Sequence, residues 1–249
     1  DAELSNFCDW LPRKLELLKQ EGLLQQVPGF FIATVVDLSF NRIGDDGVRR
    51  LMTTLRELKV VVGKLFLFRN MLGRGAANVL ASWIRSDLMP PFELHLSHNF
   101  VPSEGVLELL EAVASTGKYP SQRIRRSSRE EPRCPLWLRI ESNLPRAEDF
   151  CVEAEKILRI CWVTDRSDKR GCRSDWCAHK TGADLTPVHL TYATQQRRNE
   201  GVVPDAAKRW DLSRSPEEER LRWSVPPAHL PTPEVHPIPP VSEEPSVAE

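Results

Sequence analysis

Three cysteines and a histidine in the last third of the chain carry the residue types of a zinc site. Cys161, Cys172, Cys177 and His179 offer three thiols and an imidazole, which are the ligand types of tetrahedral structural Zn²⁺. The spacing lacks the Cys-x-x-Cys pair that usually sets the geometry of such a site. We therefore interpret them as ordinary thiols, with no metal and no other cofactor, and keep zinc binding as the alternative.

The remaining polar residues do not form a catalytic motif. His95 and His98 are three residues apart on a predicted strand, so their side chains cannot share one face with ideal geometry. We find no nucleophile triad, phosphate-binding glycine loop or carboxylate pair with a recognisable spacing. The prediction is a protein that is not an enzyme.

A basic insertion, residues 118–133, is the second candidate for binding chemistry. It contains six basic residues against two glutamates. Arginines could attract RNA or an acidic partner, but the segment lacks the interleaved aromatic residues on which single-stranded bases stack. A solvated loop is the favoured interpretation, and nucleic-acid binding through this loop and the cysteine segment is kept as an alternative.

Composition limits the function classes. The 249 residues carry a net charge of −1, which argues against a surface built throughout for nucleic acid or anionic lipid. Apolar runs are too short to span a membrane. Six cysteines are too sparse for a disulfide scaffold, and no secretory leader is recognisable. We expect an intracellular protein, cytoplasmic rather than nuclear, without membrane contact.

An internal repeat organises the first two thirds of the chain. Four segments read apolar-x-apolar-x-x-Asn, and their asparagines are separated by 29, 29 and 44 residues. A glycine and then apolar residues at helical spacing follow the first three. Each unit thus predicts a strand, a turn and a helix, and each asparagine is expected to satisfy backbone groups of its turn. These asparagines are Asn41, Asn70, Asn99 and Asn143.

This pattern resembles the leucine-rich repeats of the ribonuclease-inhibitor-like class, over about residues 32–160. The resemblance implies an α/β fold: a short leucine-rich-repeat solenoid with parallel strands on the concave face and α-helices on the convex face. Four such repeats make a short arc, which the basic insertion interrupts.

The repeats divide the chain into further segments. We expect a helical N-terminal cap, with its helix running from Asp9 to about Glu21, and a strand at Val188–Tyr192 that pairs beside the fourth repeat strand and closes the sheet edge. Prolines and charges after that point predict a disordered tail. The predicted segments are the cap 1–31, the repeats 32–160, a cysteine-containing C-terminal cap 161–196 and the Pro-rich tail 197–249.

In repeats of this class the residues between the inward leucines face the concave surface. Four predicted rows cross the strands: Val35, Lys64, Glu93, Trp137; then Asp37, Phe66, His95, Arg139; then Ser39, Phe68, Ser97, Glu141; then Phe40, Arg69, His98, Ser142. They contain aromatic and arginine side chains, which are enriched at binding hot spots, at positions where polar residues are usual. The predicted contact residues are Phe66, Phe68, Arg69, His95, Trp137 and Arg139. The alternative is that these aromatics pack on one another or under the tail.

The leading hypothesis is a non-catalytic scaffold that binds another protein on the concave face. A second hypothesis is regulation of a small GTPase, because similar repeats occur in activators of Ran-type GTPases; Arg69 or Arg139 would be its candidates. The run Pro237–Pro240 in the tail is also typical of ligands for SH3 or WW domains.

Overall fold

The computed structural model describes most of the patterned region. The described residues are 2–22, 26–27, 29–86, 89–121, 133–143, 147–163, 172, 177 and 185–191. All of them belong to one compact unit, Asp1–Asp211, and a second unit, Leu212–Glu249, lies outside the described residues. The predicted tail and residues 122–132 of the basic insertion also lie outside them.

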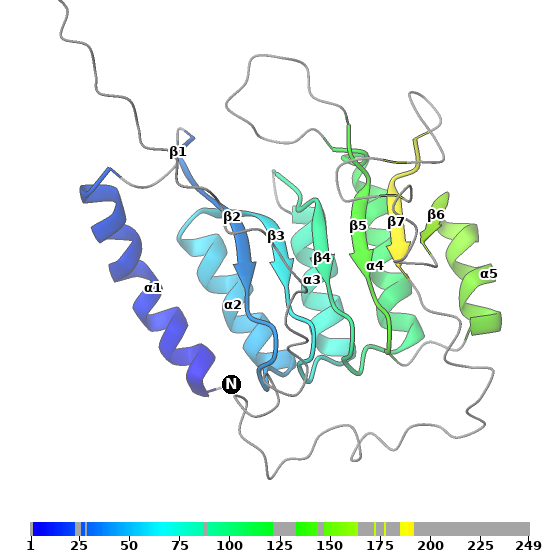
Figure 1. Cartoon of the computed structure of the whole chain (residues 1–249), viewed down its shortest axis with the longest axis horizontal. Coiled ribbons are helices and arrows are strands. Elements are labelled where there is room, and N and C mark those ends of the chain that lie inside the picture. Colours follow the sequence, from blue (N-terminus) through cyan, green and yellow to red (C-terminus); the bar gives the residue numbers. More distant parts are fainter. Residues whose placement is uncertain are drawn as a thin grey trace, which may run out of the picture. The chain divides into compact units, whose positions relative to one another are not determined.

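A seven-stranded sheet with helices on one side forms the fold (Figure 1). The strand order is β1-β2-β3-β4-β5-β7-β6; β1 pairs antiparallel with β2, and the other pairs are parallel. The strands are β1 (Gln26–Val27), β2 (Phe30–Asp37), β3 (Val60–Phe66), β4 (Glu93–His95), β5 (Leu136–Arg139), β6 (Ile160–Val163) and β7 (Val188–Thr191). The helices are α1 (Ala2–Gln20), α2 (Asp45–Glu57), α3 (Arg74–Ser86), α4 (Ser103–Thr116) and α5 (Ala147–Ile157). The predicted α/β class with a parallel sheet is confirmed.

The core lies between the sheet and the helices. Leu65 of β3, Leu94 of β4 and Leu138 of β5 are fully buried. They belong to the same apolar cluster as the buried residues of α2, α3 and α4. Each consecutive pair of helices from α1 to α5 is in contact. Full burial of each such leucine stabilises the fold by about 1.5–3 kcal/mol. In the described part of the chain, no helix is both long enough and apolar enough to cross a lipid bilayer.

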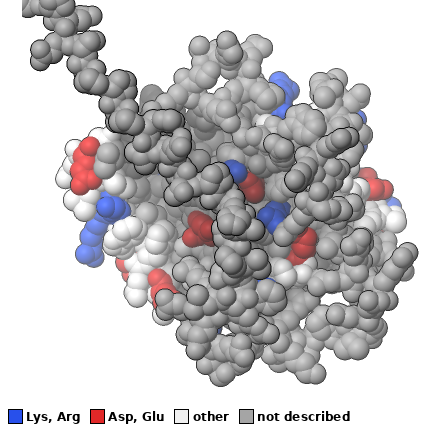
Figure 2. All heavy atoms as spheres, in the orientation of Figure 1, with Lys and Arg blue, Asp and Glu red and all other residues white. Residues whose placement is uncertain are grey.

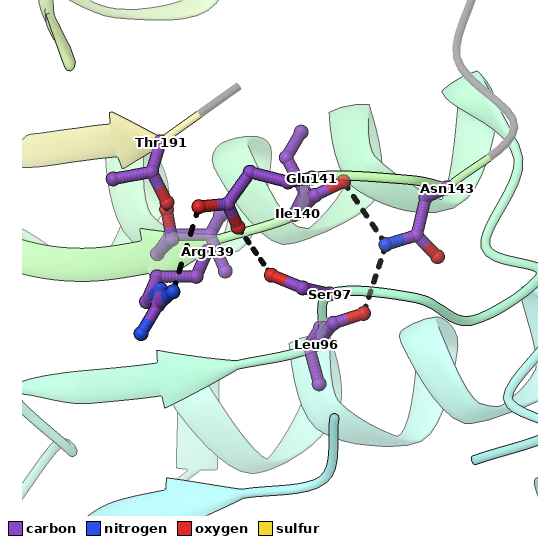
Figure 3. A network of polar contacts seen from close by, with 8 residues as sticks. Leu96, Ser97, Arg139, Ile140, Glu141, Asn143 and Thr191 are labelled. Carbon is purple, nitrogen blue, oxygen red and sulfur yellow. Dashed lines mark hydrogen bonds and ion pairs between the residues drawn. The ribbon is translucent and has the colours of Figure 1, made fainter. Parts of the chain in front are cut away.

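Three of the four repeat asparagines connect successive turns of the chain. Asn70 Nδ2 donates to the carbonyls of Leu38 and Leu67, and Asn99 Nδ2 donates to those of Leu67 and Leu96. Each side chain therefore satisfies the turn of its own unit and the turn before it. Asn143 makes the same pair of bonds one unit later, to Leu96 and Ile140 (Figure 3), whereas Asn41 bonds within its own turn, to Leu38 and Ser39.

The residue before each asparagine has a left-handed backbone. The φ values are 59° at Phe40, 55° at Arg69, 57° at His98 and 57° at Ser142. This conformation costs a non-glycine residue about 1–2 kcal/mol, so the asparagine bonds offset strain that recurs at the same place in every unit. These four residues belong to the turns, although sequence reasoning grouped them as a row of the concave face.

The N-terminal helix begins earlier than predicted. It begins at Ala2 rather than near Asp9, and it accommodates Pro12 in its interior. Its buried side chains are Leu4, Cys8 and Leu15, whose spacing of four and seven residues gives one apolar stripe against α2. Trp10 is 50% exposed, because it lies off that stripe.

The last two strands are ordered differently from the prediction. Strand β7 does pair with β5, the fourth repeat strand, which confirms that part. It does not close the edge, however, because β6 pairs with the other side of β7. The edge strand β6 precedes β7 in the sequence, but β7 lies between β5 and β6 in the sheet.

Candidate functional site

The face of the sheet turned away from the helices, named here the front face, carries the predicted contact residues. The strand register confirms two of the predicted rows. One row runs Val35, Lys64, Glu93, Trp137 and the next runs Asp37, Phe66, His95, Arg139. The parallel pairing extends the first row through His189 to Cys161. The front face is therefore continuous from β2 to β6.

Four aromatic rings form a cluster on the front face where β3 and β4 end, and they belong to Phe40, Phe66, Phe68 and His95. Phe68 stacks on His95 with ring centroids 4.6 Å apart, and it meets Phe40 edge-on at 4.5 Å. Phe66 lies edge-on to His95 at 5.9 Å, and the Arg69 guanidinium lies 5.6 Å from the Phe40 ring. Each aromatic pair of this kind contributes about 0.5–1.5 kcal/mol. The rings pack on one another, and Phe66, Phe68 and Arg69 remain partly exposed.

His95 is the most enclosed member of this cluster. It is 8% exposed, and burial, followed by the nearby charges of Arg139 and His98, lowers its pKa to about 3. Its Nε2 atom has no hydrogen-bond partner among the described residues. The imidazole is therefore neutral at physiological pH and serves as a packed aromatic ring.

Charged side chains of both signs lie over the strands of the front face (Figure 2). Lys64 Nζ lies 2.8 Å from Glu93 Oε2, and Arg139 lies 3.6 Å from Glu141. The hydroxyl of Ser97 donates to the carboxylate of Glu141 (Figure 3). Arg139 is thus paired with a carboxylate two residues after it in the chain.

The structure divides the predicted contact set. Phe66, Phe68, Arg69 and His95 lie together, whereas Trp137 lies farther along the first row. The Trp137 ring contacts His189 edge-on, with centroids 5.2 Å apart and planes at 87°. Trp137 therefore belongs to a different group of residues.

That second group is a cluster of three thiols and an imidazole. Cys161, Cys172, Cys177 and His189 present one ligand atom each, and these atoms all lie within 4.8 Å of one another. Burial raises the pKa of the Cys161 thiol, and hydrogen bonding to Cys172 raises it further. His179, the histidine that the sequence suggested, lies outside the described residues.

Sequence reasoning missed His189 as a member of this cluster. The available signal was the alternation of Val188–Tyr192, which predicted a strand beside the fourth repeat strand and therefore placed His189 on one face of the sheet. What was lacking was the pairing of β7 with β6, which sets Cys161 directly opposite His189.

A second contact that sequence reasoning missed lies between α2 and α3. The carboxylate of Asp45 accepts hydrogen bonds from the backbone N–H groups of Gly73, at 2.7 Å, and Gly75, at 2.9 Å. Asp45 thus caps the N-terminus of the next helix, where a negative charge is favourable.

No protein-family model matches the chain, and no curated protein matches it. Among solved structures, one match is titled Leiomodin-1 Actin-Binding Site 2 (ABS2), with 16% sequence identity and a TM-score of 0.36. The alignment covers 50% of this chain and 62% of that chain. A match at this TM-score supports no conclusion about the fold or the function of this chain.

Proposed function

We propose that residues 32–160 are a short leucine-rich-repeat domain of the ribonuclease-inhibitor-like class and that its front face binds another protein without catalysis. Support for the class comes from the parallel strand, turn and helix in each unit and from the bonds of Asn70 and Asn99 between successive turns. In such repeats the strand face turned away from the helices is the concave surface.

The observation that carries the binding proposal is the composition of the front face at β3 and β4. Phe66 and Phe68 are partly exposed on a strand face where polar side chains are usual, and Arg69 lies beside them. Aromatic and arginine side chains are the types that contribute most at protein interfaces. Met71, two residues after Arg69, is a further exposed apolar side chain, with 41% of its surface accessible.

This chemistry defines the kind of partner. An apolar side chain of the partner would lie against Phe66 and Phe68, and an acidic group would face Arg69. Lys64 and Glu93 already neutralise each other at 2.8 Å, so they contribute polarity at the edge of the contact rather than net charge.

Affinity capture with Phe66→Ala tests the proposal. The matched control is Val152→Ala, which truncates a 56% exposed apolar side chain on α5. We expect the proteins enriched by the wild type to be enriched equally by Val152→Ala and at least about tenfold less by Phe66→Ala, a loss of about 1.4 kcal/mol. Matching urea midpoints would show that both variants are folded.

Two outcomes contradict the proposal. A folded Phe66→Ala variant that captures the same proteins at wild-type levels would place the interface elsewhere. Equal losses in both variants would show that capture depends on general surface hydrophobicity rather than on the front face.

A further inference from the structure

Three strands bring two of the four cluster residues together by register alone. Strand β7 lies between β5 and β6, so His189 is paired with Trp137 on one side and with Cys161 on the other. Partners in a parallel register point to the same face of the sheet. Cys161 and His189 are 6% and 0% exposed, and the Trp137 ring, edge-on to the imidazole at 5.2 Å, restricts its orientation.

The other two thiols come from the segment between β6 and β7. Cys172 Sγ lies 3.6 Å from Cys161 Sγ and 4.0 Å from Cys177 Sγ. A Zn–S bond of about 2.3 Å in a tetrahedron gives S···S edges of about 3.8 Å. These two distances lie on either side of that edge length, and all four ligand atoms lie within 4.8 Å of one another.

The same distances disfavour a disulfide as the purpose of the cluster. A disulfide needs its sulfurs about 2.05 Å apart, and these three cysteines are present as thiols rather than as disulfides. Pairing any two would also leave the third sulfur and the imidazole in a buried polar pocket. Three sulfurs and one nitrogen around a common centre are instead a complete ligand set.

We propose that Cys161, Cys172, Cys177 and His189 form a structural Zn²⁺ site that links Cys172 and Cys177 to strands β6 and β7. Soft thiolates with one imidazole select zinc over the oxygen-seeking Mg²⁺ and Ca²⁺. Four protein ligands leave no open position, which makes the site structural rather than catalytic.

Metal analysis of the full chain, purified under reducing conditions, tests the proposal. We expect about one zinc per chain in the wild type and almost none in Cys172→Ser, whose half-buried position makes it the mildest of the ligand changes. Cys8→Ser is the matched control, because Cys8 is a buried thiol on α1 and should leave the zinc content unchanged.

Two histidine variants test the fourth ligand. His179→Ala should keep its zinc, whereas His189→Asn should lose it. Zinc lost from His179→Ala and kept by His189→Asn would overturn the assignment of His189.

Cobalt substitution tests the site without any variant. Wild-type chain refolded with Co²⁺ should show the thiolate-to-cobalt charge-transfer and d–d absorption of tetrahedral sulfur coordination. A folded wild type that lacks zinc and shows no such absorption would overturn the proposal, as would zinc contents that are equal in Cys172→Ser and Cys8→Ser.

Discussion

Removing the Asn99 side chain should destabilise the protein far more than removing the equivalent side chain of Asn41. Asn99 is 1% exposed, and its Oδ1 accepts hydrogen bonds from the backbone N–H groups of Asn70 and Leu72, both at 3.1 Å. In Asn99→Ala both N–H groups lose this acceptor. A buried donor left unsatisfied costs about 1–3 kcal/mol, so the pair predicts a loss of about 4 kcal/mol.

The carbonyls that Asn99 serves add little to that loss. The Leu67 carbonyl also accepts from Asn70 Nδ2, and the Leu96 carbonyl also accepts from Asn143 Nδ2. Each therefore keeps a donor when Asn99 is truncated. The two N–H groups dominate the calculation.

Asn41 supplies the matched control because it is the same residue type at the start of the series. It is partly exposed, and its Nδ2 donates to the Leu38 and Ser39 carbonyls of its own turn. The Leu38 carbonyl keeps a second donor in Asn70. We expect Asn41→Ala to lose about 1 kcal/mol.

Urea unfolding, followed by far-UV circular dichroism and tryptophan fluorescence, measures both losses. The reasoning requires a difference of about 3 kcal/mol between Asn99→Ala and Asn41→Ala. Losses that agree within about 1 kcal/mol would refute it, because bonds between successive turns would then be worth no more than bonds within one turn.

Two further predictions concern α3 and His95. A Cβ at Gly75 would lie 2.5 Å from Asp45 Oδ2, so Gly75→Ala should lower the free energy of unfolding by about 2 kcal/mol, although alanine has the better helix propensity. In an Asp45→Ala background this loss should disappear. An unchanged loss in urea unfolding would contradict the capping role of Asp45. The pKa of His95 is about 3 in the folded protein, against 6.5 for the free side chain. The contribution of the neutral His95 to folding stability is therefore complete above pH 6.5 and is lost as the pH falls toward 3. Wild-type stability should therefore fall relative to His95→Phe by up to about 1.4 kcal/mol per pH unit in that window, and parallel pH profiles would show that His95 titrates normally.

The strand rows were predictable because they depend on local patterns. The spacing of Asn41, Asn70 and Asn99 matches the register of β2, β3 and β4, and Asn70 and Asn99 each bond to the turn of the preceding unit. Alternation then decides which side chains reach the front face. The partners of Lys64 and Phe66 follow from the sequence for that reason.

Contacts between distant segments were not predictable in the same way. Strand β6 has no asparagine motif, so no pattern showed that β7 would pair between β5 and β6. The start of α1 was wrong because Asp9 fits an N-cap by type, whereas burial of Leu4 and Cys8 extends the helix to Ala2. Packing energy outweighs a capping preference worth about 1 kcal/mol.

Trp137 connects the two proposals and limits each of them. In the sequence it resembles an interface hot spot, but its ring packs edge-on against the fully buried His189. A tryptophan engaged in that way positions a ligand of the proposed zinc site and offers less surface to a partner. The proposed binding surface then consists of Phe66, Phe68 and Arg69 near β3 and β4, while β5, β7 and β6 carry residues of the proposed zinc site and its neighbour Trp137. Such a compact surface suits a short segment of a partner better than a broad domain face, because stable domain interfaces bury about 800 Å² on each side.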